Sequence, residues 1–447
     1  MQKDYTRGSI LRHILSLAIP ATGSIALSGF SSLVDVFWLG RLGSEELAAA
    51  SMGMSLRMVA ISMLMGVSIG GAALVARYVG AQDKRRANRV ALQIAFLAVG
   101  IGVLVGVVGY IWAEPLLYLM GARGEVLALG VQWVRVIFAG LVFMEMLPTM
   151  NQVLYGAGNP ERAFQANLAY VSVLITFEPL LIFGLGSLPG LGIQGASLAR
   201  VLASGVGIAF QWYVLLAGKA RVKVDLHDIR LDFPMMGRVM KLAVPTGVTH
   251  LAMNLAGTLT YRVIAPFGVA TIAAFGVVSK VLSFAFTLPG GVILSPRTMV
   301  GQNLGAGKPE RAMRAGWSAA GLSAALTASQ MVLVFILAEP ILALFNADPA
   351  VIAEGSRGLL YLALPQIAYS VGDCVSVALI GAGDTVSPMW ISMGSLWMAR
   401  LPLMYGFAHL LGWGPVGIWV GMGLAQVAEA LAMAVRFGQG KWKMRKL

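Results

Sequence analysis

Long apolar runs separated by short polar connections make up most of this chain. One of them, "HILSLAIPATGSIALSGF" at residues 13–30, continues into "SSLVDVFWLG" at 31–40 and holds a single carboxylate, Asp35. A helix needs about 20 apolar residues to cross about 30 Å of hydrocarbon at about 1.5 Å per residue. Runs of this length predict twelve membrane-spanning helices, over residues 14–38, 51–76, 90–112, 131–155, 165–186, 193–217, 239–264, 270–295, 312–337, 355–380, 387–408 and 415–437.

The composition agrees with a polytopic membrane protein. Of the 447 residues, 58% are hydrophobic and 12% are charged, and the mean hydropathy is +0.78; a soluble domain carries about 25% charged residues. The 54 glycines let helices approach closely in lipid, where hydrophobicity does not drive helices together. Prolines inside the predicted spans, such as Pro148, Pro179 and Pro289, indicate kinks. The expected fold is therefore all-α and integral to a membrane.

The positive charges lie on one side of the predicted membrane. Of the 33 Lys and Arg, 22 fall in the two termini and in every second connection, whereas the alternate connections hold only Arg41, Arg123 and Arg357. This positive-inside bias places both termini in the cytoplasm. It also accounts for the net charge of +13 as a topology signal, so we expect no nucleic-acid partner.

Four motifs recur along the chain, each at the same offset of 225 residues. They are "LAIP" (17–20) with "LAVP" (242–245), "VGAQDKRRA" (79–87) with "LGAGKPERA" (304–312), "AEPLLYL" (113–119) with "AEPILAL" (338–344), and "LYGAGNP" (154–160) with "LIGAGDT" (379–385). Chance could give one such pair, but four pairs in the same order indicate a duplicated six-span unit. Because six is even, both copies enter the membrane from the same side. This predicts two six-helix bundles related by a pseudo-two-fold axis along the membrane normal.

The duplication also predicts the domain organisation. We expect an N-terminal lobe of six helices over residues 1–217, a cytoplasmic linker over 218–238, and a C-terminal lobe over 239–447. A site near the bilayer midplane between two such bundles suits transport by alternating access.

The sequence offers little support for catalytic or metal chemistry. Cys374 is the single cysteine, and the four histidines are scattered without metal-ligand spacing. The "GAG" loops lack the GxxxxGK[ST] pattern of an ATP-binding loop, and we interpret them as tight turns with glycine at positive φ. We therefore expect no enzyme activity, no metal, and no cofactor apart from a coupling ion. We find no removable signal peptide at the N-terminus, so the first span should act as its own insertion signal.

The repeated loops "LVARYVGAQDKRRA" and "MVGQNLGAGKPERA", the "GAGNP" and "GAGDT" turns, and "VDVFWLGRLG" at the end of the first span resemble the multidrug and toxic compound extrusion (MATE) family. The resemblance covers nearly the whole chain and is strongest to the archaeal and DNA-damage-inducible-F-like branch. It implies export of lipophilic, often cationic, small molecules in exchange for protons or sodium ions. A lipid-linked oligosaccharide flippase of the same superfamily remains the alternative, although twelve spans argue against it.

The resemblance also implies a set of coupling residues. It assigns an acidic residue to the position of Asp35 and joins it in a polar network with residues of the fourth and fifth spans. Asn151 matches the asparagine of the fourth span, and Glu178 matches the acidic position of the fifth. The asparagine expected four residues before that acid is Leu174 in this chain, which is a departure from the family pattern.

Carboxylates inside predicted spans are costly, which makes them functional candidates. For Asp35 the alternative is an interfacial ion pair with Arg41 or Arg57. The repeat offset maps Asp35 to Thr260, so the architecture itself does not demand an acid there. Glu178 precedes Pro179, and its alternative role is a water-facing residue at a helix break.

Three further acids complete the set. Glu145 could be a substrate contact, or a partner of Arg135 or Lys280. Asp373 is the best acidic candidate of the C-terminal half, as a second cation site or a substrate contact, with only Ser370 and Ser376 near it in sequence to add oxygen ligands. Glu429 should lie near the cytoplasmic interface.

Many cations lie inside the predicted spans or within two residues of their ends. They are Arg57, Arg77, Arg135, Arg200, Arg262, Lys280, Arg297 and Arg400. Those near span ends can extend their charged groups to the interface, but the number of deeper ones leaves anionic or zwitterionic substrates open. The remaining expectations are a monomer in a prokaryotic cytoplasmic membrane, with the lipid bilayer and small-molecule substrates as its partners.

Overall fold

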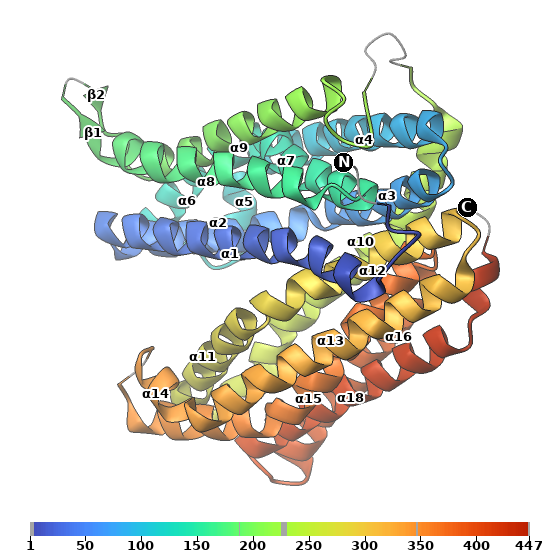
Figure 1. The fold of residues 1–447 in the computed structure, drawn as a ribbon. Coiled ribbons are helices and arrows are strands. Elements are labelled where there is room, and N and C mark those ends of the chain that lie inside the picture. The colour runs from blue at the N-terminus through green and yellow to red at the C-terminus, as the bar shows by residue number, and fades with distance from the viewer. Residues whose placement is uncertain (1–3, 187, 225–229, 346, 446–447) are drawn as a thin grey trace. The chain divides into compact units, whose positions relative to one another are not determined.

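The structure, a computed structural model, describes residues 4–186, 188–224, 230–345 and 347–445 and is almost entirely helical (Figure 1). Within these residues one short antiparallel pair, β1 (Gly184–Leu185) and β2 (Leu188–Pro189), closes the connection between two helices. The helices of the first half are α1 (Ile10–Leu42), α2 (Ser44–Ala60), α3 (Ser62–Gly80), α4 (Lys84–Ile111), α5 (Ala113–Leu119), α6 (Gly124–Ala139), α7 (Leu141–Ala157), α8 (Pro160–Phe183) and α9 (Ile193–Leu216).

The second half repeats this series with local differences. Its elements are α10 (Phe233–Ile264), η2 (Ala265–Phe267), α11 (Val269–Ala285), α12 (Thr287–Gly305), α13 (Pro309–Ile336), α14 (Ala338–Ala343), α15 (Pro349–Gly381), α16 (Val386–Met393), the π-helix η3 (Gly394–Arg400), α17 (Leu401–Tyr405), the π-helix η4 (Gly406–Leu410), α18 (Pro415–Gly438) and η5 (Lys441–Met444). The bounds of α11, α12 and α13 are the repeat equivalents of the bounds of α2, α3 and α4, so the repeat seen in the sequence is also a repeat of helix boundaries.

The helices account for the twelve expected spans. Among the described residues, eight single helices are long and apolar enough to cross a membrane, and two bent pairs, α6–α7 and α11–α12, raise the number to ten. The other two expected spans coincide with α10 and with the run from α16 to η4. That run alternates between α- and π-helical hydrogen bonding, which divides it into short pieces.

The two halves differ in where they bend. Helices α6 and α7 meet at 55°, with Gly140 between them. The equivalent position in the second half is Pro365, and there α15 runs unbroken. The bend of 57° between α11 and α12 immediately precedes Pro289, whereas Pro148 and Pro179 lie inside unbroken helices. Proline alone therefore does not predict where this chain breaks a span.

By packing, the chain divides into two compact units. Residues 23–247 form the first unit, and residues 4–22 together with the chain from 248 onward form the second. This division differs from lobes over 1–217 and 239–447 at both boundaries. Helix α1 leaves the second unit after Thr22, and α10 leaves the first unit after Gly247, which is the equivalent position in the second copy of the repeat.

Backbone contacts explain why the N-terminal segment belongs to the second unit. Asn303 and Lys308 donate side-chain hydrogen bonds to the carbonyl oxygens of Tyr5 and Thr6, at 3.3 and 2.9 Å. Tyr5 is fully buried and packs in an apolar cluster with Leu17 of α1. The loop "VGQNLGAGKPERA" therefore anchors the start of the chain.

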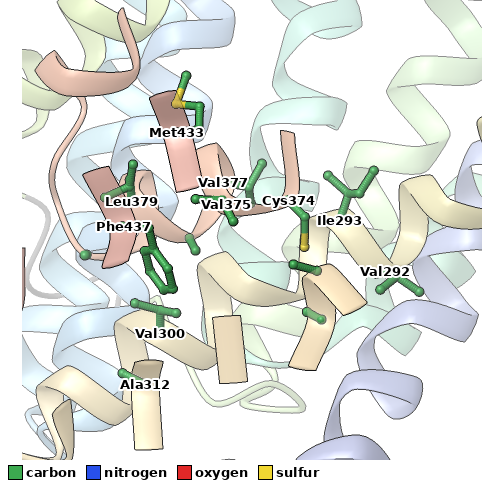
Figure 2. Packing of buried hydrophobic residues seen from close by; sticks show 14 of the residues in the cluster. Val292, Ile293, Val300, Ala312, Cys374, Val375, Val377, Leu379, Met433 and Phe437 are labelled. Carbon is green, nitrogen blue, oxygen red and sulfur yellow. The ribbon is translucent and has the colours of Figure 1, made fainter. Parts of the chain in front are cut away.

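Apolar side chains and closely packed glycines form the cores of both units. In the second unit Val300, Leu379 and Phe437 pack together where α12, α15 and α18 meet (Figure 2). The first glycine of each "GAG" turn permits a close helix contact: a Cβ on Gly156 would lie 2.4 Å from the carbonyl oxygen of Ala72, and one on Gly381 would lie 2.6 Å from that of Arg297. These two contacts are equivalent under the repeat.

The second glycine of each turn has a different role. Gly158 and Gly383 end their helices at φ values of 81° and 84°, the left-handed region that glycine adopts at no steric cost. The tight-turn interpretation of the "GAG" loops therefore agrees with the backbone.

Candidate coupling site

Asp35 lies in the last third of α1, within the first unit, and its side chain is buried. It forms an ion pair with Arg200 of α9. Its Oδ1 has no hydrogen-bond partner among the described residues. Neither of the partners suggested by the sequence is the observed one. The guanidinium of Arg41 stacks over the ring of Phe37, at 4.7 Å from the ring centroid.

Glu178 lies beside this pair. It belongs to α8, which packs along α9, and its side chain is fully buried. Neither carboxylate oxygen has a hydrogen-bond partner in the described part of the chain. Its carboxyl interacts electrostatically with both Asp35 and Arg200, so the structure brings together two of the three predicted coupling residues.

Tyr170 completes the group, which we call the first-unit charge cluster: Asp35, Tyr170, Glu178 and Arg200. Tyr170 lies on α8 about two turns before Glu178, and its hydroxyl interacts with all three charged members. With both carboxylates ionised, the cluster carries a formal charge of −1. With one proton added it is neutral.

A second buried ion pair lies close to the cluster. Arg57 of α2 pairs with Glu145 of α7, and both side chains are largely buried. Arg135 and Lys280, the partners considered from the sequence, are not the ones observed. Arg57 also interacts with Tyr170, so this internally balanced pair adds no net charge to its surroundings.

Asn151, the third predicted coupling residue, belongs to a different network. Its amide nitrogen donates to Asn167 of α8 at 2.9 Å, and its oxygen accepts from Gln211 of α9 at 2.8 Å. Asn167 precedes Glu178 by eleven residues, which is about 16 Å along a helix. These hydrogen bonds of Asn151 therefore do not link it to Asp35 or Glu178.

Leu174 explains part of this separation. It lies one turn before Glu178, is fully buried, and packs against Ala199 and Ala203 on either side of Arg200. An amide at this position could link the acid to a polar network, but a leucine cannot. The polar partner of this region is instead Arg200 of α9.

The sequence presents Arg200 as one of several intramembrane cations and does not connect it with Asp35. The signal that it does contain is local. Arg200 lies in "GASLARVLASG", where small residues on both sides let neighbouring helices approach closely. A long cation in that setting requires a buried anion.

The second unit holds a more open group around Asp373 of α15. Asp373 is half-buried and interacts with Glu429 and Arg297. Glu429 accepts a hydrogen bond of 2.7 Å from Ser392, and Tyr369 interacts with Asp373, Glu429 and Arg400. Two acids and two cations thus lie in one region of this unit, without the equivalents of Asp35 or Glu178.

Neither group resembles a metal centre. Among the described residues no three His, Cys, Asp or Glu side chains are arranged to hold a metal ion. What the first-unit charge cluster can do chemically is exchange one proton, because it contains one more carboxylate than guanidinium.

Comparisons with known proteins agree with the internal repeat. The sequence pattern of the MatE family matches residues 20–180 and again 245–405, two segments whose ends are equivalent under the repeat. The probable multidrug resistance protein NorM of Thermotoga maritima is 22% identical over 439 residues, which cover 98% of this chain and 94% of that protein. The FAD transporter of Shewanella oneidensis is 27% identical over 403 residues, covering 88% and 87%.

Solved structures show the same fold. A multidrug resistance MATE family transporter in an outward-facing conformation superposes with a TM-score of 0.90, at 23% identity over 98% of each chain. A MOP superfamily transporter from Pyrococcus furiosus gives 0.90 at 22% identity, also over 98% of each chain. The family pattern covers most of the sequence, once in each half, and the chain therefore belongs to the MatE family of membrane transporters.

Proposed function

We propose that this protein is a secondary antiporter that exports lipophilic, mainly cationic, small molecules in exchange for protons, and that the first-unit charge cluster is its coupling site. One observation carries the proposal: Glu178, a fully buried carboxylate with no hydrogen-bond donor in the described part of the chain, lies beside a second carboxylate inside a membrane-embedded bundle. Ionisable residues at such depth mark ion pathways and proton relays. Relatives named as multidrug resistance proteins support the class of substrate.

The coupling follows from charge. With a proton the cluster is neutral and compatible with an apolar bundle. Without it, the cluster holds one uncompensated negative charge, which is costly in a medium of low polarity. The two protonation states therefore favour different arrangements of α1, α8 and α9, which carry the charged groups. A transporter that takes up the proton outside and releases it inside links this change to export of substrate by alternating access.

The proposal is tested with Asp35→Asn in proteoliposomes loaded with ethidium. In the wild type, an acidic exterior should accelerate dye efflux, because protons enter as dye leaves. The variant should lose this acceleration, and Glu114→Gln, an exposed acid of α5, should keep it. Repeating the assay with a sodium gradient at constant pH tests sodium coupling. Acceleration of the Asn variant equal to that of the wild type would end the proposed role of this site.

A second substrate class is favoured by one observation in the second unit. The Nε of Arg400 is buried without a hydrogen-bond partner among the described residues, next to Tyr369. A guanidinium N–H without a partner can donate to an anion, and the relative from Shewanella oneidensis is named an FAD transporter. We therefore keep anionic aromatic molecules as a second candidate. Competition of ethidium efflux by FAD, measured in wild type and Arg400→Gln, distinguishes the two classes.

We also propose the following setting for the protein. It acts as a monomer without a cofactor in the cytoplasmic membrane of a prokaryote, with both termini in the cytoplasm, and it belongs to the archaeal and DNA-damage-inducible-F-like branch of the family. The bias of 22 cations against three supports the orientation, and Asp35 with Glu178 supports the branch. Reporter fusions at the C-terminus test the orientation.

A further inference from the structure

We infer that Glu178, rather than Asp35, is the group that binds and releases the proton, and that Asp35 serves as the fixed counterion of Arg200. This inference rests on the proposed function and divides the roles within the coupling site. It makes Arg200 a positioning residue, and it predicts that one proton, but no sodium ion, acts at this site.

The first step is the unequal pairing of the two acids. Among the described residues, Asp35 forms an ion pair with Arg200, whereas Glu178 forms no ion pair of its own and neither of its oxygens has a hydrogen-bond partner. A carboxylate paired with a guanidinium keeps its charge even when buried, whereas a carboxylate buried without a donor or a cation of its own is stable only in the neutral form. Both acids are almost fully buried, so burial does not distinguish them, but their partners do.

The second step is the unused oxygen of Asp35. One of its oxygens faces Arg200, and its Oδ1 has no partner among the described residues. Glu178 is close enough to interact with Asp35, and a protonated Glu178 is the hydrogen-bond donor that this oxygen lacks. Adding the proton forms one O–H bond on Glu178 and satisfies two buried groups at once. Its release to water breaks that bond, and no other group changes its charge.

The charged groups beside the cluster do not change its net charge. Apart from Glu178, the charged and titratable groups in and beside the cluster are Asp35 on α1, Arg57 on α2, Glu145 on α7, Tyr170 on α8 and Arg200 on α9. Arg57 and Glu145 neutralise each other, and Tyr170 is a neutral phenol. The cluster therefore alternates between 0 and −1 as Glu178 loses its proton.

Helix α8 is suited to respond at this point. Pro179 follows Glu178 directly and cannot donate a backbone hydrogen bond, so α8 lacks one bond in the turn that carries the acid. When Glu178 is ionised it competes with Asp35 for Arg200. The deprotonated state thereby draws α8 towards α9, and protonation releases it.

The same geometry disfavours sodium. A hard cation needs several oxygen ligands, but one oxygen of Asp35 is taken by Arg200, and Leu174 stands where the family pattern has an amide. A sodium ion beside Glu178 would also be repelled by the guanidinium. A proton needs neither a ligand shell nor space.

Four variants separate the roles: Glu178→Gln, Asp35→Asn, Arg200→Gln and the double change Asp35→Asn with Arg200→Gln. The readout is the acceleration of ethidium efflux by external acid in proteoliposomes. Glu178→Gln should reduce this acceleration by about tenfold or more, because the variant lacks the carboxyl group that binds the transported proton. Asp35→Asn should reduce it as strongly, because Arg200 is left to pair with Glu178 and holds it ionised.

The double variant is the decisive one. It removes the Asp35–Arg200 ion pair without changing the net charge and leaves Glu178 in place. The acceleration should therefore return to within about threefold of the wild type, well above that of Asp35→Asn or Glu178→Gln. Arg200→Gln alone leaves two carboxylates without a cation and should raise the pH at which efflux responds to acid. A double variant as impaired as Asp35→Asn, or a Glu178→Gln variant that keeps the acceleration, overturns the inference.

A binding measurement covers the case in which a variant no longer transports. In weakly buffered detergent solution, ethidium binding to the wild type should release protons. Asp35→Asn with Arg200→Gln should still release them, and Glu178→Gln should not; the reverse pattern overturns the inference. Thermal unfolding of each variant shows that it is folded.

If neither a pH nor a sodium gradient drives efflux in the wild type, the proposed function fails. If a sodium gradient alone drives it, the division of roles fails.

Discussion

At the scale of single residues, the repeat reveals one position that is locally strained. Gln82 is the single non-glycine with positive φ among the described residues, at 59°, and its equivalent in the second copy of the repeat is Gly307, at 70°. A left-handed backbone costs an ordinary residue about 1–2 kcal/mol, and glycine avoids this cost. The two copies of the loop therefore differ in how well the residue at this position fits its backbone.

Gln82→Gly should raise the free energy of unfolding by about 1 kcal/mol. No side-chain hydrogen bond of Gln82 opposes the change in the described structure. Thermal unfolding in detergent measures the effect, and Gly307→Gln is the matched control, with an expected loss of similar size. Equal unfolding temperatures for both variants and the wild type would contradict the strain argument.

Asp384 gives a pH-dependent prediction. It is fully buried in the "GAGDT" turn and accepts hydrogen bonds from Arg436 and Ser387, with Arg445 as a further ion-pair partner. Burial alone would raise the pKa of Asp384, but these hydrogen bonds and the charge of Arg445 hold it below its usual value. A lowered pKa stabilises the fold above the unfolded value of about 3.9, and this stabilisation is lost as the pH falls through the folded value.

Asp384→Asn should therefore cost about 2 kcal/mol at pH 7, because two partly exposed arginines lose their common partner. The difference from the wild type should shrink towards zero as the pH falls through the lowered pKa of Asp384, because the carboxyl is then protonated in both the folded and the unfolded state. Unfolding temperature as a function of pH checks this. Glu310→Gln, which removes an exposed partner of Lys443, should cost less than about 0.5 kcal/mol. If Asp384→Asn loses the same stability at every pH, the loss comes from the shape of the side chain and not from its charge.

The residue scale also shows what sequence could predict. Asp35 and Glu178 were identifiable because a carboxylate in an apolar span is costly and therefore informative. Their partner was not, because the pairing of α1 with α9 depends on how the helices are rotated about their axes. The same reason explains Glu145, whose partner Arg57 lies 88 residues away and not on the neighbouring turns.

At the scale of helices, the prediction concerns the glycines of the "GAG" turns. Gly156 lets α7 touch α3, and Gly381 lets α15 touch α12, each against a backbone carbonyl. Replacing either with alanine forces these helix pairs apart and should cost about 1–3 kcal/mol. A Cβ added to Gly205 of α9 would meet no atom within 4 Å, so Gly205→Ala should be neutral or gain up to about 1 kcal/mol. Unfolding temperatures of the three variants rank them.

The number and approximate positions of the spans followed from hydropathy and the repeat, but the helix bounds and shapes did not: the predicted span 51–76 runs across the break between α2 and α3. Hydropathy measures burial in lipid, and it does not register whether a helix bends at Gly140 or runs straight through Pro365. Neither did it predict the π-helical segments between Gly394 and Leu410. Such features depend on side-chain packing against neighbouring helices, which a single sequence does not contain.

At the scale of the whole molecule, the two units exchange the beginnings of their first helices. Each unit is built from one repeat in sequence, except that residues 4–22 pack in the second unit and the start of α10, up to Gly247, packs in the first. A sequence repeat locates the duplication but carries no information on which copy of an equivalent segment packs with which unit. This exchange is therefore a property of the fold that the sequence halves do not reveal.

The exchange predicts how fragments behave. If the chain is divided after Val224, the first fragment lacks Ala243 and Gly247, whose backbone packs on Gly66 of α3, and the second lacks Tyr5, whose carbonyl binds Asn303. Each fragment expressed alone should be digested rapidly by trypsin in detergent, because an unfilled helix position exposes apolar and backbone groups. Expressed together, the fragments should form a complex that resists trypsin and retains ethidium efflux.

Deleting residues 4–22 from the first fragment is the control that locates the effect. In the co-expressed pair this deletion should make the second fragment sensitive to trypsin and leave the first resistant. The reason is that residues 4–22, although they belong to the first fragment, pack in the second unit. Independent stability of both undeleted fragments would mean that each sequence half folds by itself. If the fragments depend on each other in this way, each unit needs a segment from the other half of the chain. The two halves should then fold together rather than independently.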